Sequence, residues 1–205
     1  KKMFYFQSKD INSNLLLNKN FIKILKRKNF VKKTLFSSVV PKYTILVKKF
    51  LKKKYKINFF EIKDSNIDKI IKINIKKKSQ VGSDRIANAV GAYKKYKRNA
   101  IILDFGTATT FDVVTNAGVY NGGVIAPGVN LSLKSLVGSA DQIPQFSIKR
   151  RKKIIGKNTL EALRAGFYWG YTGLINNIIL KIEKETGVKY KIIFTGGYSN
   201  LFKSS

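Results

Sequence analysis

Ile101–Gly128, which reads IILDFGTATTFDVVTNAGVYNGGVIAPG, is the stretch that decides the fold. Its first apolar residues predict a buried strand that ends at Asp104, followed by a tight turn at Phe105-Gly106. Three hydroxyl residues come next: Thr107, Thr109 and Thr110. Because Gly106 would let the backbone turn with its N–H groups outward, while Asp104 offers oxygen to a hard cation, this order predicts a phosphate and cation site at a strand end.

The remainder of this stretch predicts a hairpin. Thr110–Thr115 and Val119–Ile125 are apolar and β-branched, and the residues between them include Asn116 and Gly118, which favour turns. Beyond the hairpin, Gly122-Gly123 and Pro127-Gly128 are expected to let the backbone pass close to a ligand.

The charge pattern separates this stretch from the rest of the chain. A D-x-G-T tetrapeptide alone is equally typical of an ordinary strand end and turn. From Ile101 to Ser147, however, there is one lysine, Lys134, against three aspartates, in a chain of net charge +30. A segment that stays small and apolar in such a chain indicates a constrained shape.

Composition excludes several classes of site. Without cysteine or histidine, the chain has no disulfides, no thiolate metal site and no histidine-based acid–base chemistry. Of its 41 basic residues 35 are lysine and six arginine, which favours a solvated lysine surface over a nucleic-acid interface. No apolar run reaches the roughly 18 residues of a membrane span, so we expect a cytoplasmic protein.

The N-terminal half predicts alternating strands and helices. Thr34–Val40 is typical of a strand, and Pro41 suits the first turn of a helix that continues to Lys54 with Tyr43, Ile45, Leu46, Phe50 and Leu51 on its apolar face. Asn58–Ile62 predicts a second strand. Asn20–Asn29 favours a short basic helix, and Ile67–Ile75 fits no single element.

Gln80–Arg85, QVGSDR, predicts a turn that runs into a helix. Ser83 is a favourable N-cap, and Asp84 would lie in the first turn, where the helix dipole favours negative charge. One interpretation of Asp84-Arg85 is therefore a helix cap with a surface ion pair. The other is a functional carboxylate beside a guanidinium that keeps it ionised.

The C-terminal half predicts a helix at Val129–Val137 and a long one at about Thr159–Glu185. Gly166, Gly170 and Gly173 would weaken this second helix by roughly 1 kcal/mol each, unless another backbone packs there. They indicate either a kink or a close contact with another helix or subunit. Lys189–Phe194 predicts a strand that leads into a second glycine turn, Thr195-Gly196-Gly197.

Together these segments resemble type III pantothenate kinases, members of the superfamily of sugar kinases, heat-shock chaperones and actin. The resemblance covers about Thr34–Gly197 and rests on six motifs in family order: SSVVP at Ser37–Pro41, GSDR at Gly82–Arg85, DFGTATTFD at Asp104–Asp112, GGVIAPG at Gly122–Gly128, IGKNT at Ile155–Thr159 and TGG at Thr195–Gly197.

The resemblance implies an α/β fold with two ribonuclease-H-like domains, residues 1–100 with the substrate loop at 82–85 and residues 101–205 with the nucleotide and cation turn at 104–110. It implies ATP-dependent phosphorylation of pantothenate in the first step of coenzyme A synthesis. The expected cofactors are Mg²⁺ and a monovalent cation, K⁺ or NH₄⁺, and the expected assembly is a homodimer.

The site residues that the resemblance implies fall into three groups. Pantothenate would contact Gly82, Ser83, Asp84, Arg85 and Thr159, with Asp84 as the general base. ATP would contact Gly106, Thr107 and Gly196. Asp104 would bind the monovalent cation. The competing interpretation of Thr159 is a plain helix start.

The sequence also departs from the family pattern. Nothing before Thr34 matches the family's D-x-G-N-T phosphate loop, the segment after TGG is short, and Ile75 stands where the family has a tyrosine. We therefore expect the chain to lack both ends of the pattern, with its first domain incomplete. These departures and the +30 charge leave two alternatives: a transcription-accessory or nucleic-acid-binding relative, and an inactive fragment of the kinase.

Overall fold

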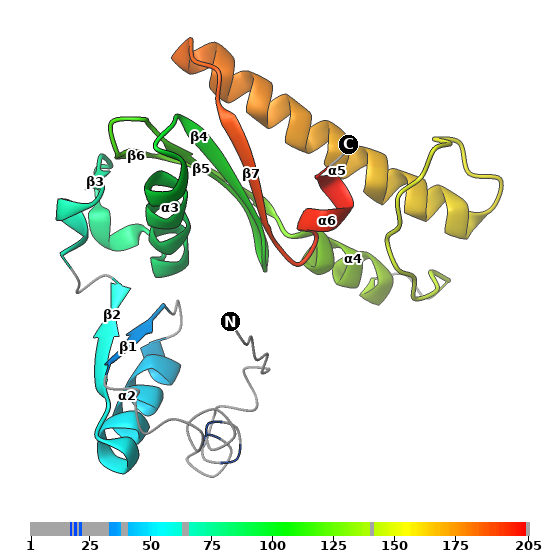
Figure 1. Ribbon diagram of the computed structural model, residues 1–205. Coiled ribbons are helices and arrows are strands. Elements are labelled where there is room, and N and C mark those ends of the chain that lie inside the picture. Colours follow the sequence, from blue (N-terminus) through cyan, green and yellow to red (C-terminus); the bar gives the residue numbers. More distant parts are fainter. Residues whose placement is uncertain are drawn as a thin grey trace. The chain divides into compact units, whose positions relative to one another are not determined.

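The computed structural model describes residues 17, 19, 21, 33–37, 41–62, 66–139 and 142–203 (Figure 1). The chain divides into two compact units. The first consists of Lys1–Ile70 with Ser79–Ala87, and the second of Ile71–Lys78 with Asn88–Ser205. Both belong to an α/β protein in which mixed sheets are flanked by helices.

The first unit contains two parallel strands joined by a helix. β1 (Lys33–Phe36) pairs with β2 (Asn58–Glu61), and α2 (Pro41–Tyr55) connects them (Figure 1). The helix that begins at Pro41 and the strand that begins at Asn58 are thus confirmed. Of the predicted strand Thr34–Val40, Thr34–Phe36 is strand and Ser37 is not, and residues 38–40 lie outside the described residues. Of the predicted basic helix Asn20–Asn29, only Phe21 lies within the described residues, and it is helical.

The face that α2 buries differs from the predicted one. The core of this unit consists of Leu17, Val47, Phe50, Leu51 and Ile57. Ile45, which we expected on the apolar face, is 54% exposed, and Val47 is buried instead. The helical period predicts how the buried residues of α2 are spaced, but which side of the helix faces inward depends on the strands that it covers.

The second unit is built on a five-stranded mixed sheet in the order β3-β6-β5-β4-β7. β4 (Ala100–Phe105), β5 (Ala108–Val114) and β6 (Val119–Pro127) are antiparallel, which confirms the predicted strand and hairpin. β7 (Lys191–Gly196) and β3 (Lys72–Ile73) add parallel strands at the two edges. The segment Ile67–Ile75 divides into a short helical turn, η3 (Ile67–Lys69), and β3; a second such turn, η4, spans Lys78–Gln80.

Each face of this sheet carries helices. The inward residues of β4 and β5, such as Leu103 and Phe111, pack with α4 (Val129–Gly138), α5 (Thr159–Thr186) and α6 (Ser199–Phe202) in one core. Because successive side chains alternate, Asp104 points to the opposite face. There it meets α3 (Ser83–Tyr96) (Figure 1).

Two glycines of the GGVIAPG segment serve the fold in a way that we did not predict. A side chain at Gly123 would overlap the carbonyl of Phe111, and one at Gly128 would overlap the carbonyl of Thr107. These glycines therefore let backbone pass close to backbone. Close approach of a ligand to Gly122-Gly123 and Pro127-Gly128 stays a prediction.

The long helix α5 is continuous over 28 residues. Asn158 caps its start by accepting a hydrogen bond from the Glu161 amide at 2.9 Å, and Gly187 ends it with φ of 68°. A Cβ added at Gly166, Gly170 or Gly173 would meet no atom of the described residues within 4 Å. Among the described residues, therefore, no helix packs closely on this glycine face of α5.

Candidate functional site

Asp104 lies where two parallel strands end together. β4 and β7 run in register, with Asp104 opposite Thr195 and Phe105 opposite Gly196. The carboxyl ends of parallel strands are the usual position of ligand sites in α/β proteins. The predicted cation residue, Asp104, and the predicted second glycine turn are thus brought together.

Two groups fix the surroundings of the Asp104 carboxylate. Its Oδ2 accepts a hydrogen bond from Nδ2 of Asn88 on α3 at 2.8 Å. Its Oδ1 lies against the backbone of Gly196, where φ is 85° and a Cβ would lie 2.6 Å from that oxygen. Glycine at this position therefore keeps a side chain from residue 196 away from Oδ1, which helps this oxygen to serve as an ion ligand.

The turn after Asp104 differs from the prediction in one detail. The Gly106 amide donates to the carbonyl of Ala108 at 3.0 Å, so its N–H group is used within the turn. The expectation that this N–H points outward is therefore wrong, because the hairpin closes over it. Thr107 beside it is exposed, and its hydroxyl is accessible to a ligand.

A fully buried carboxylate lies on the same face of the sheet as Asp104. Asp112 is 0% exposed, and it accepts hydrogen bonds from the Tyr120 hydroxyl at 2.7 Å and the Thr110 hydroxyl at 3.3 Å. A buried carboxylate needs such partners because desolvation otherwise disfavours its charge. This network holds β5 and β6 together beneath the strand ends.

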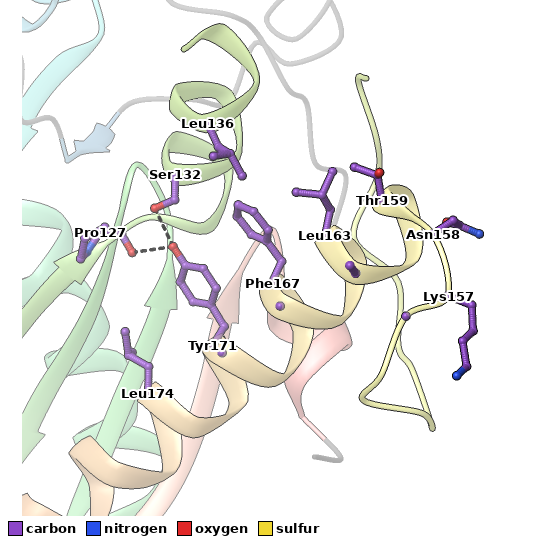
Figure 2. Close-up of a pocket in the computed structure, with 14 residues that line it drawn as sticks. Pro127, Ser132, Leu136, Lys157, Asn158, Thr159, Leu163, Phe167, Tyr171 and Leu174 are labelled. Atoms are coloured by element: carbon purple, nitrogen blue, oxygen red, sulfur yellow. Dashed lines mark hydrogen bonds between the residues drawn. The ribbon is translucent and has the colours of Figure 1, made fainter. Parts of the chain in front are cut away.

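A groove of about 950 Å³ lies between α4 and the first half of α5. Its lining includes the predicted pantothenate residue Thr159, the glycines Gly166 and Gly170, and Tyr171. Figure 2 shows the Tyr171 hydroxyl directed at Ser132 on α4, to which it donates at 2.8 Å, and at the Pro127 carbonyl, 3.4 Å away. The groove is mostly apolar, with polar atoms at its Thr159 end.

The remaining predicted substrate residues lie in the first unit. Ser83 is 2% exposed, and its hydroxyl accepts a hydrogen bond from the Ser37 hydroxyl at 3.2 Å, which joins the SSVVP and GSDR motifs. Asp84 is exposed in the first turn of α3, where its Oδ1 accepts from the Arg85 amide at 2.8 Å. The Gly82 carbonyl accepts the first helical bond, from Ile86.

Sequence reasoning missed three polar residues. Asn88 carries a signal in hindsight, because it is a polar residue among alanines four positions after Asp84 in α3. Ser132 and Tyr171 carried none, since only the packing of α4 against α5 brings them together.

The described residues contain no group of three or more aspartates and glutamates that would hold a metal ion by themselves. A single carboxylate such as Asp104 suits a monovalent ion or a metal that also binds a phosphate. None of the helices in the described part of the chain combines the length and apolar character that a bilayer crossing requires.

Comparison with known proteins gives a consistent family. The family model for type III pantothenate kinase matches residues 4–181. The chain is 53% identical over 189 residues to the type III pantothenate kinase of Pelagibacter ubique, covering 92% of this chain and 75% of that protein. It is 40% identical to the enzymes of the same name from Paramagnetospirillum magneticum and Rhodospirillum rubrum, of which it covers 65% and 66%.

A solved structure from Campylobacter jejuni, assigned to the Baf family of transcriptional activators, has the same fold. Its TM-score is 0.57 at 23% identity, over 90% of this chain and 77% of that one. At this identity the likeness concerns the fold alone. On the family model and the close relatives, the chain belongs to the type III pantothenate kinase family.

Proposed function

We propose that the chain transfers the γ-phosphate of ATP to the primary hydroxyl of pantothenate, the first step of coenzyme A synthesis. The observation that carries this proposal is the family membership, supported by a carboxylate and a glycine turn at the ends of two parallel strands. Phosphoryl transfer needs little covalent chemistry from the protein, so positioning and charge dominate.

The second unit supplies the nucleotide side. Gly106, Thr107 and Gly196 are the proposed ATP contacts, with Thr107 as a hydroxyl donor to phosphate. Support comes from the exposure of Thr107 and from the position of Gly196 beside Asp104. The Gly106 contribution is limited to its carbonyl and its lack of a side chain, since its amide is already bonded.

The substrate side consists of Gly82, Ser83, Asp84, Arg85 and Thr159. Asp84 accepts the hydroxyl proton as the alcohol attacks, and its exposure in the first turn of α3 supports that role. Arg85 offers a planar fork that suits the carboxylate of pantothenate.

Two ions are proposed with this chemistry, and the described residues offer a ligand to one of them. Asp104 would hold the monovalent cation, K⁺ or NH₄⁺, since its Oδ1 faces a backbone without a side chain. Mg²⁺ would bind chiefly through ATP phosphates, because the described residues hold no carboxylate cluster for it. Bound there, these ions neutralise charge on the phosphates.

The test is ATP-dependent formation of phosphopantothenate by the purified chain, with Mg²⁺ and K⁺ present. We expect Asp84→Asn to lower kcat by roughly 10²–10⁴-fold, the usual contribution of a general base. Asp68→Asn, at an exposed aspartate of the same unit, is the matched control and should leave kcat unchanged. Turnover that survives Asp84→Asn would remove Asp84 from the role of base.

We further propose that the chain forms a homodimer through the glycine face of α5, defined by Gly166, Gly170 and Gly173. Glycines in a helix interior are costly unless a backbone packs on them, and the described residues provide none. A second ribonuclease-H-like domain, the boundary at residue 100 and a cytoplasmic location stay predictions.

A second candidate function is nucleic-acid binding by a non-catalytic relative. The net charge of +30 favours it, whereas the excess of lysine over arginine does not. Binding of duplex DNA that persists at physiological salt and prefers a sequence would support it. Binding that is lost at that salt would indicate only a lysine-rich surface, and a chain that binds neither DNA nor ATP would be an inactive fragment.

A further inference from the structure

We propose that Asn88 is a positioning residue for the monovalent-cation ligand Asp104. The inference rests on the proposed function of Asp104 and adds a residue to it. Asn88 lies on the second turn of α3, in the second unit together with β4 and β7, and its amide donates to Oδ2 of Asp104 at 2.8 Å. Both side chains are partly buried, which limits competition from water.

The amide controls the orientation of the carboxylate. A carboxylate on a strand end rotates about two bonds, and its terminal torsion has a broad minimum. The hydrogen bond to Oδ2 fixes that rotation, so that Oδ1 stays against the backbone of Gly196. Asn88 thus keeps Oδ2 in a hydrogen bond with the protein and leaves Oδ1 to bind the cation.

Asparagine suits this position better than the residues that resemble it. A lysine would donate a hydrogen bond but would also bring a positive charge next to a cation site, and an aspartate cannot donate when ionised. A neutral donor leaves the negative charge of Asp104 available to the ion. Partners of this kind commonly change ion affinity by 10–100-fold when they are replaced.

The experiment compares the full chain with Asn88→Ala and Asn88→Leu, and uses thermal unfolding as the first readout. Melting temperature is measured against KCl concentration, with choline chloride keeping the ionic strength constant. The unsubstituted chain should be stabilised by K⁺, and both variants should need at least tenfold more K⁺ for half of that effect. Asn74→Ala is the matched control, because Asn74 donates to Asn121 at 3.1 Å elsewhere in the same unit.

Kinetics provide the second readout. At saturating K⁺ the variants should keep most of their kcat and their KM for pantothenate, while the K⁺ concentration for half-maximal activity rises by the same tenfold or more. A structural role alone would lower the melting temperature without moving either K⁺ midpoint, and that result would overturn the inference. The alanine and leucine variants test it independently, should one of them not fold.

The outcomes also separate this inference from the proposed function. If K⁺ does not stabilise even the unsubstituted chain, the role of Asp104 as a cation ligand fails, and the role of Asn88 fails with it. The kinase proposal itself is then judged by phosphopantothenate formation. If K⁺ stabilises the unsubstituted chain and both Asn88 variants equally, only the role of Asn88 is overturned.

Discussion

At the scale of single residues, Gly196 is the position where one added carbon matters most. Its φ of 85° is a conformation that side-chain-bearing residues rarely adopt, and a Cβ would lie 2.6 Å from both Asp104 Oδ1 and the Phe105 amide nitrogen. We therefore expect Gly196→Ala to lower the free energy of unfolding by about 1–3 kcal/mol. Urea denaturation measures the change.

Gly91→Ala is the control for this substitution. Gly91 lies in the interior of α3, and a side chain there would meet no atom within 4 Å. Alanine should therefore stabilise the chain by up to about 1 kcal/mol, because it favours the helix. If both substitutions changed the free energy of unfolding by the same small amount, the backbone at Gly196 would have to shift easily to accommodate a Cβ.

Single residues also mark the limit of what the sequence predicts. Asp104 was placed correctly at a strand end, because an apolar run followed by a turn is a local pattern. Its hydrogen bond with Asn88 depends on how α3 packs against the sheet, which no local pattern specifies. The contact of Gly128 with the carbonyl of Thr107 could not be predicted for the same reason, since it forms only in the folded chain.

At the scale of elements, the sequence predicted the order of most strands and helices, whereas some boundaries differ: β1 ends at Phe36 and β7 spans Lys191–Gly196. The hairpin of β5 and β6 was predictable because alternation and turn residues are both local. The parallel pairing of β7 with β4 joins strands that are far apart in the sequence, so no local pattern predicts it. The inward side of α2 was uncertain because its apolar residues extend around much of the helix.

The junction between α5 and β7 is held by a glutamate. Glu183 accepts from the Lys189 ammonium at 2.6 Å and from the Tyr190 amide at 3.2 Å, and these bonds lower the pKa of its carboxyl below the ordinary value of 4.5. A lowered pKa in the folded state stabilises the fold above the ordinary value. That contribution is lost as the pH falls through the folded pKa.

We therefore expect Glu183→Gln to lower the melting temperature at pH 7 and to have no effect at a pH well below 4.5. The effect should be small and should shrink in salt, because Lys189 is exposed. Glu185→Gln controls for the loss of one negative charge from a chain of net charge +30. A melting difference between the two variants that is independent of pH would contradict the proposed pairing.

At the scale of the whole molecule, the glycine face of α5 makes the homodimer testable. Gly170 lines the groove between α4 and α5, and a Cβ there would meet no atom of the described residues within 4 Å. Leucine favours a helix more than glycine does, so Gly170→Leu should fold at least as well as the unsubstituted chain. Its side chain would nevertheless separate two backbones that pack on each other at this position.

Light scattering after size-exclusion chromatography is the measurement. The molar mass of the unsubstituted chain should be twice the 23.2 kDa of one chain. At the same concentration, the Gly170→Leu variant should have the mass of one chain. Gly91 is the control position: a Cβ there also meets no atom of the described residues within 4 Å, but Gly91 lies on α3, at the opposite face of the sheet. The Gly91→Leu variant should therefore remain a dimer. A dimer that tolerates Gly170→Leu would place the interface elsewhere, and the glycines of α5 would then have to serve the groove itself.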